Sequence, residues 1–197
     1  GYGYRSGYAL DFFTVTNSTF SHYKGLDSTS QNVVQNNMQC IRSSGGDGNV
    51  ISDNTFIDCP FGVSVLRSPY YYTHQSSEIG SDNITISNNV FEDGGEFADV
   101  WFQQNNEVQG ATITDNEFNP SPGANAATSA HAILIYSGNT KDILIQDNTA
   151  VGGDDAFYLQ NIDNFVVDGN TIIGNGDPTA TGIYVDRGSG NITDNTV

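Results

Sequence analysis

The residues best suited to acid–base chemistry are an arginine, a tyrosine and two histidines placed near strand-like segments. Arg67 ends the segment "GVSVLR", and Tyr72 and His74 lie in the insertion that follows it. His131 begins the segment "HAILIYS". Removal of a proton beside a carboxylate needs a group that neutralises the carboxylate, a base and a proton donor. These four residues are the candidate catalytic set for β-elimination or epimerisation of a uronic acid.

Acidic, Gly-rich turns are candidates for a metal site. The turn "GGDD" ends in Asp154 and Asp155. Three similar turns lie at 45–49, 92–96 and 174–178. Their oxygens are the ligands that Ca²⁺ takes in proteins, but Asp and Gly are also the commonest turn residues. The expected cofactor is therefore Ca²⁺ or none, with solvated turns as the competing interpretation.

A short pattern with Asn in its fourth position recurs along the chain. It reads "ISDNTF" at 51, "ISNNVF" at 86, "ITDNEF" at 113 and "ITDNTV" at 192. The fourth position falls at Ser18, Asn37, Asn54, Asn89, Asn116, Asn148, Asn170 and Asn195. The gaps between these positions vary from 17 to 35 residues, which is typical of a coil whose loops differ in length.

A second set of segments lies between the copies of this pattern. These segments are "GVSVLR", "DVWFQQ", "AILIYS", "AFYLQN" and "GIYVDR". Apolar residues alternate in both sets, and no stretch shows helical periodicity, so each coil offers at least two strands. The Asn comes where the chain must turn. Stacked coils place equivalent Asn side chains about 4.8 Å apart, where they can form a hydrogen-bonded ladder.

Alternation in the second set also predicts an outward face. With Val63, Val100, Ile133, Phe157 and Ile183 turned inward, aromatic and amide side chains point outward. The predicted binding residues are Trp101, Gln103, Tyr136, Tyr158, Gln160, Tyr184 and Arg187. Aromatic planes stack on the apolar faces of sugars and amides bond to hydroxyls, which favours a polysaccharide ligand. The competing interpretation is that these aromatics pack against covering loops.

The Asn-bearing segments resemble the rungs of right-handed parallel β-helix proteins, which include pectate lyases, polygalacturonases, alginate epimerases and lyases, and phage tailspikes. The resemblance covers nearly the whole chain. It implies an all-β, right-handed parallel β-helix (a β-solenoid) of about eight rungs with an Asn ladder, and the handedness comes from the family alone. We expect a single domain over residues 1–197 that continues in a longer chain or stack, because both ends expose a rung.

The "GGDD" turn resembles the "GDD" rung of polygalacturonases, where paired carboxylates act as acid and base in glycoside hydrolysis. Asp154 and Asp155 would take those roles. However, the rungs that read "NTD" and "GHG" in that family read "SAHA" and "TATG" here, and nothing basic replaces its "RIK" segment. Hydrolysis of that type is therefore less favoured than a lyase or epimerase reaction, for which no family signature is present either.

Charge and cysteine content limit the partners and the compartment. Six Lys and Arg against 23 Asp and Glu give a net charge of −17, which repels nucleic acids, anionic membranes and also a polyuronate unless calcium intervenes. No stretch reaches the roughly 18 apolar residues of a membrane helix. Cys40 and Cys59 lie one turn apart in the repeat, as a disulfide in an oxidising compartment or as two buried thiols.

These observations predict an extracellular or cell-surface polysaccharide-binding β-helix, without nucleic acid or membrane insertion. If it is an enzyme, we expect a lyase or epimerase acting on an acidic polysaccharide. The alternative is a non-enzymatic adhesin or filament protein whose copies associate end to end.

Overall fold

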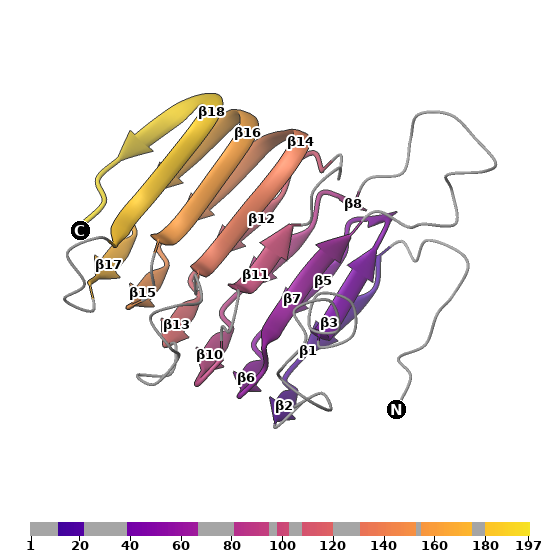
Figure 1. Cartoon of the computed structure of the whole chain (residues 1–197). Coiled ribbons are helices and arrows are strands. Elements are labelled where there is room, and N and C mark those ends of the chain that lie inside the picture. Colours follow the sequence, from indigo (N-terminus) through magenta and orange to yellow (C-terminus); the bar gives the residue numbers. More distant parts are fainter. Residues whose placement is uncertain are drawn as a thin grey trace, which may run out of the picture.

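Parallel strands wind through the described part of the chain in successive layers. The computed structural model describes residues 12–21, 39–66, 81–94, 98–102, 108–119, 131–152, 155–174 and 180–197. Every regular element within these ranges is a β-strand, and none of them contains a helix able to cross a membrane. Neighbouring strands come from successive windings and pair in parallel, so the chain forms a parallel β-helix (Figure 1). The all-β prediction is confirmed.

The layers form three walls. The first wall contains β3 (Gln39–Ser44), β7 (Phe61–Leu66), β11 (Ala98–Phe102) and the first parts of β14 (His131–Gln146), β16 (Asp155–Asp168) and β18 (Thr181–Thr193). The second wall contains β1 (Thr14–Thr16), β5 (Val50–Ser52), β9 (Thr85–Ser87), β12 (Thr112–Thr114) and the second parts of β14, β16 and β18. The third wall contains β2 (Thr19–Ser21), β6 (Thr55–Ile57), β10 (Val90–Glu92), β13 (Glu117–Asn119), β15 (Thr149–Val151) and β17 (Thr171–Ile173).

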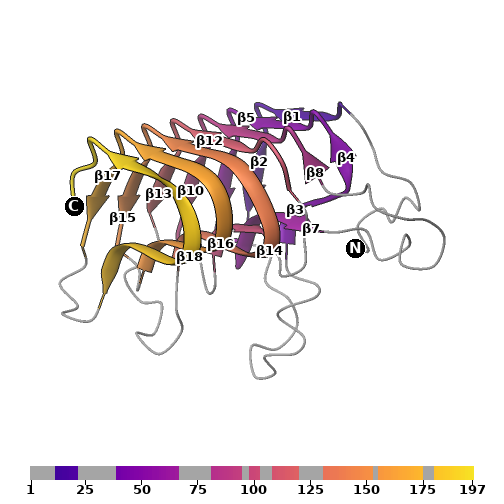
Figure 2. The ribbon, with the colours of Figure 1, turned by 90° about the horizontal axis from the view of Figure 1, so that it is seen from above.

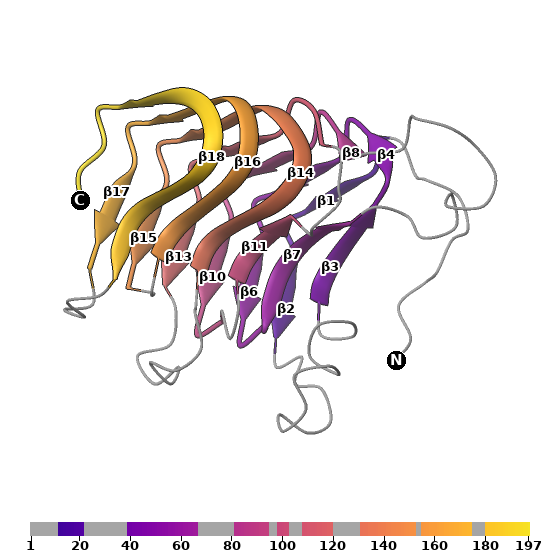
Figure 3. The ribbon, with the colours of Figure 1, turned by 45° about the horizontal axis from the view of Figure 1, so that its top comes forward.

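The long strands join two of these walls. β14, β16 and β18 curve from the first wall into the second, so both walls belong to one ten-stranded sheet (Figure 2). The third wall is a separate six-stranded sheet, visible as a row of short arrows in Figure 3. A separate two-stranded sheet is formed by β4 (Gly46–Asp47) and β8 (Ser81–Asp82). In sequence, each of these strands follows a strand of the first wall and precedes a strand of the second wall.

A ladder of Asn side chains follows the corner between the second and third walls. Its members are Asn54, Asn89, Asn116, Asn148, Asn170 and Asn195. From Asn89 onward, each Oδ1 atom accepts two hydrogen bonds from the Asn of the preceding layer, one from its backbone N–H and one from Nδ2, at 2.8–3.1 Å. Nδ2 also donates to a carbonyl of the second wall, as from Asn116 to Ile86 at 2.9 Å. The predicted ladder is confirmed, and it satisfies amides that the corner would otherwise bury unpaired.

The turn at this corner is made by the residue before each ladder Asn. Asn17, Asp53, Asn88, Asp115, Asp147, Gly169 and Asp194 have φ between 51° and 65°. Asn, Asp and Gly are the residues that enter the left-handed region most easily. The prediction that the ladder Asn itself occupies the turn is therefore wrong by one residue.

The ladder begins with a serine. The backbone N–H of Ser18 donates to Asn54 Oδ1 at 3.0 Å, and β1 pairs directly with β5. The slot predicted at Asn37 lies outside the described residues.

The core consists of apolar columns from all three walls. Four phenylalanines of the third wall stack face to face with ring centroids 4.7–5.1 Å apart, in the order Phe20, Phe56, Phe91 and Phe118. On the second wall Ile51, Ile86 and Ile113 lie in register and are fully buried. Each layer buries its inner side chains against the next, which is how a solenoid obtains its stability.

Cys40 and Cys59 form a disulfide. Their Cα atoms are 6.2 Å apart, and the bond closes a loop with a sequence separation of 19. Of the two states that the sequence left open, the structure therefore contains the bonded one.

Candidate functional site

The outer surface of the first wall carries the predicted outward residues in register. Strand pairing aligns Ser64, Trp101, Leu134, Tyr158 and Tyr184, which we call the outer row. A second row places Tyr136, Gln160 and Asp186 side by side. Between the two rows, Ile135 and Leu159 are buried and Val185 is half-buried, so the rows lie on one side of the wall with strands about 4.8 Å apart. Gln160 in the second row is itself only 8% exposed.

The outer row is not equally accessible along its length. Tyr184 is 41% exposed, whereas Ser64 is completely buried and its hydroxyl has no hydrogen-bond partner in the described part of the chain. Ser64 lies between Arg42 and Trp101 in the register. Trp101, Leu134 and Tyr158 are half-buried, so the accessible part of the row runs from β11 to β18 and is greatest at Tyr184.

Aromatic rings on this surface stack on one another. The rings of Tyr158 and Tyr184 have centroids 4.9 Å apart with an interplanar angle of 25°. Trp101 stacks in the same manner on Phe61, at 4.9 Å and 28°. Each of these contacts covers one face of both rings, which leaves the ring edges, the tyrosine hydroxyls and the uncovered faces for a ligand.

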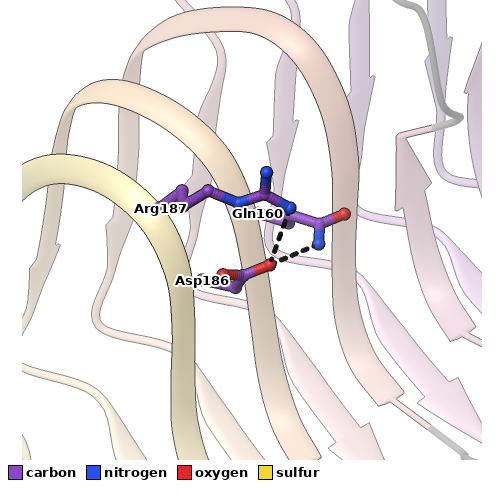
Figure 4. A network of polar contacts seen from close by, with 3 residues as sticks. All are labelled: Gln160, Asp186 and Arg187. Carbon is purple, nitrogen blue, oxygen red and sulfur yellow. Dashed lines mark hydrogen bonds and ion pairs between the residues drawn. The ribbon is translucent and has the colours of Figure 1, made fainter.

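A polar network occupies the second row beside the tyrosines. Gln160 Nε2 donates to Asp186 Oδ2 at 2.6 Å, and Arg187 Nη2 donates to the same oxygen at 3.3 Å (Figure 4). The hydrogen bond from Gln160 and then that from Arg187 lower the pKa of Asp186 below its ordinary value. Asp186 is therefore a carboxylate at neutral pH, and it accepts hydrogen bonds without donating any.

Arg187 has an unusual backbone conformation. Its φ is 58°, and every other non-Gly residue with positive φ in the described chain is Asn or Asp, apart from Phe12. The equivalent position in the preceding layer is Asn161, with φ 54°. It follows from the register, because Gln160 pairs with Asp186 and Ile162 pairs with Gly188. A long side chain in this region costs roughly 1 kcal/mol, and such strain is often found at functional sites.

The phenol of Tyr158 stays protonated over a wider pH range than usual. Burial is the largest cause that raises its pKa, followed by the nearby Tyr184, Asp186, Tyr136 and Asp155. Its hydroxyl is therefore a hydrogen-bond donor rather than a base.

Comparison with known protein families decides the classification of this fold. Residues 74–197 match the family described as right handed beta helix region. The chain belongs to this right-handed β-helix family. Comparisons with curated proteins and with solved structures gave no match. Family membership fixes the coil and its handedness and leaves the chemistry of the outer surface open.

His131 is the one member of the predicted catalytic set that the described part of the β-helix contains. It is 7% exposed and begins β14. Its Nδ1 atom lies 2.7 Å from the carbonyl oxygen of Asp155, which can only accept, so Nδ1 carries the proton. The ring also lies against Tyr158, with centroids 5.5 Å apart. His131 therefore links two layers of the first wall.

The other predicted site residues fall into two groups. Arg67, Tyr72, His74, Gln103 and Asp154 lie outside the described residues, so their roles stay predictions. Asp155 begins β16, and within the described ranges no group of three or more His, Cys, Asp or Glu side chains is arranged around a metal position.

Two acidic residues were not chosen from the sequence. Asp186 lies in the second row beside Gln160. In the sequence it lies between Tyr184 and Arg187, two predicted binding residues, and this position could have marked it as a site residue. Asp99 is buried on β11, opposite Gly62 on β7 and Ala132 on β14, and Oδ2 has no partner among the described residues. Burial raises its pKa from 3.8 to about 8. No alternation pattern distinguishes such a residue from an ordinary surface carboxylate.

Proposed function

We propose that this β-helix binds polysaccharide outside the cell, along the outer surface of the first wall. The observation that carries the proposal is the Gln160–Asp186–Arg187 network, which lies one row from the half-buried Tyr158 and the exposed Tyr184. Together these residues offer phenol, amide, guanidinium and carboxylate groups on consecutive layers. Sugar hydroxyls both donate and accept, so a surface with both kinds of partner suits them.

The repeat of the coil supports a polymeric ligand. Tyr136, Gln160 and Asp186 follow one another at the strand spacing, so a ligand that runs along the coil meets a polar side chain at each regular step. Contacts from several layers then add up on one chain. The stacked rings favour binding by hydrogen bonds at this surface over broad stacking on sugar faces.

The Cys40–Cys59 disulfide supports the extracellular location. Disulfides form and persist in oxidising compartments and are rare in the cytosol. The proposal is for binding; cleavage or epimerisation of the ligand stays a prediction that depends on Arg67, Tyr72, His74 and His131.

A binding experiment tests the proposal. Affinity electrophoresis or calorimetry of the whole protein against a panel of neutral and acidic polysaccharides should detect retention or heat, and Tyr184→Ala should reduce it severalfold. Thr171→Ala on the third wall is the matched control and should bind as the native protein does. Unchanged binding by both variants would mean that another surface carries the activity.

The same samples distinguish an enzyme from a structural rod. A lyase would produce unsaturated sugars that absorb ultraviolet light, and a hydrolase would produce new reducing ends. A protein that binds none of the polysaccharides and instead forms a concentration-dependent series of end-to-end assemblies in light scattering would support the rival function as a rod.

A further inference from the structure

The charged side chains on the outer surface of the first wall determine whether it favours neutral or anionic polysaccharides. The inference drawn from them rests on the function proposed above. Asp186 is the carboxylate of the second row and lies on β18, beside Gln160 of β16. Two donors, Gln160 and Arg187, hold it on one oxygen, Oδ2. Among the described residues no donor lies on Oδ1, which is free to accept a hydrogen bond from a ligand.

The positive charge beside Asp186 is already engaged. Arg187 Nη2 lies 3.3 Å from Asp186 Oδ2, and the Arg187 side chain is 73% exposed. An anionic sugar that approaches Arg187 therefore meets the carboxylate of Asp186 at the same point. Because the lowered pKa keeps Asp186 ionised, this repulsion persists at neutral and mildly acidic pH.

The neighbouring groups suit hydroxyls rather than carboxylates. Gln160 has donated its amide to Asp186, which leaves its carbonyl oxygen as an acceptor. Tyr158 stays a neutral phenol. The whole chain adds a net charge of −17, which lowers the local concentration of any polyanion.

We infer that Asp186 determines the charge class of the ligand, and that the outer surface takes a polysaccharide whose sugars are neutral where they meet β16 and β18. A sugar hydroxyl donates to Oδ1 of Asp186, and the tyrosine hydroxyls and the Gln160 carbonyl bind its neighbours. A uronic acid at the same position would place two carboxylates together, which interfaces avoid because like charges in contact are costly.

The test compares neutral polysaccharides (β-glucan, xylan and mannan) with polyuronates (alginate and polygalacturonate) of matched length. Binding to the whole protein is measured by calorimetry at ionic strengths of about 0.01 M and about 0.15 M, where screening differs strongly. We expect the tightest binding to a neutral polysaccharide at both ionic strengths. Uronate binding should be weaker and should improve with salt.

Two substitutions should move the preference in opposite directions. Asp186→Asn should weaken neutral binding about tenfold, or about 1.4 kcal/mol, through the lost charged acceptor, and should strengthen uronate binding. Arg187→Gln leaves Asp186 without its cationic partner and should weaken uronate binding further. Asp194→Asn is the matched control: it removes one negative charge from the same layer at an exposed corner with φ 51°, which Asn adopts readily, and it should leave the preference unchanged.

Each remaining outcome overturns a stated claim. A native protein that binds a polyuronate most tightly at low ionic strength would overturn the inference and leave the proposed function intact. Equal shifts from Asp186→Asn and Asp194→Asn would also overturn it, because net charge alone would then explain them. No binding to any polysaccharide would overturn the proposed function, and the inference with it.

Discussion

At the scale of single residues, Asp99 stands apart because a carboxyl group is buried without a partner for Oδ2 among the described residues. Its neighbours in the register are Gly62 and Ala132, and a side chain at Gly94 would contact the Asp99 carboxyl, with Oδ1 only 2.9 Å from the Cβ position. Small residues therefore make room for it. Without a counter-charge beside it, burial favours the neutral acid.

The first prediction is that Asp99 makes the stability of the protein fall as pH rises. The pKa is about 8 in the folded chain and near 3.8 when exposed, so between these values the folded state keeps a proton that the unfolded state has lost. The contribution of Asp99 to the free energy of unfolding is then fully present below about pH 4 and falls by up to about 1.4 kcal/mol per pH unit until about pH 8. Urea unfolding at several pH values should give this slope for the native protein and a flatter one for Asp99→Asn. Parallel slopes would show that Asp99 is not the cause.

The second prediction concerns the backbone at Arg187. Arg187→Asn should raise the free energy of unfolding by up to about 1 kcal/mol, because Asn tolerates φ near 58° and an exposed ion pair is worth little. Arg187→Lys keeps the charge and the long side chain, so it should give no gain. Denaturant midpoints of the three proteins provide the measurement. A loss of stability in Arg187→Asn would mean that the contact with Asp186 outweighs the strain.

At the scale of elements, the Asn ladder shows which part of the fold the sequence could predict. The ladder depends on one side chain in one slot per layer, so the pattern in "ISDNTF" and its copies predicted it directly. The preceding turn residue was not recognised, because Asp53, Asn88 and Asp115 are polar like their neighbours and only φ distinguishes them. The second and third walls were also predicted as one strand, because the corner between them lies inside the repeated motif, as between β5 and β6.

The surface of the first wall was predicted in part. Alternation aligned Trp101, Tyr158 and Tyr184, because register follows from the buried residues between them. Ring orientation depends on contacts between layers that a single segment does not contain, so stacking was not foreseen. Alternation also fails where β7 begins: Phe61 stacks on Trp101, while a side chain at Gly62 would meet Phe91 of the core.

The third prediction tests the ladder in its middle and at its end. Asn116→Ala leaves the buried N–H and Nδ2 of Asn89 without their acceptor and removes one donor each from the Ile86 carbonyl and from Asn148 Oδ1, which keeps its bond from the backbone N–H of residue 116. At 1–3 kcal/mol per unsatisfied group, the two unpaired donors should cost about 2–5 kcal/mol, less what relaxation recovers. Asn195→Ala affects the half-buried last step and should cost clearly less. Free energies of unfolding in urea compare the two. Equal losses would contradict the view that burial gives the ladder its importance.

At the scale of the whole molecule, a net charge of −17 on 197 residues acts against the compact fold. Acidic side chains in successive layers repeat at the strand spacing, as Asp115 and Asp147 do at the corner turn. Such repulsion is weakly screened at about 0.01 M salt, where the Debye length is about 30 Å, and strongly screened at 0.1 M, where it is about 10 Å. We therefore expect the stability of the solenoid to depend on the ionic strength of the solution.

The fourth prediction is that NaCl raises the free energy of unfolding in urea between these two salt concentrations, and that calcium separates screening from binding. Mg²⁺ dehydrates reluctantly and needs a strict octahedral geometry, whereas Ca²⁺ accepts flexible oxygen ligands such as those of acidic turns. Equal stabilisation by CaCl₂ and MgCl₂ at the same concentration would mean screening alone. A larger effect of CaCl₂ that Asp155→Asn reduces would place a calcium site at the "GGDD" turn. Screening by dissolved ions depends on all charges together, so one substitution should change it little.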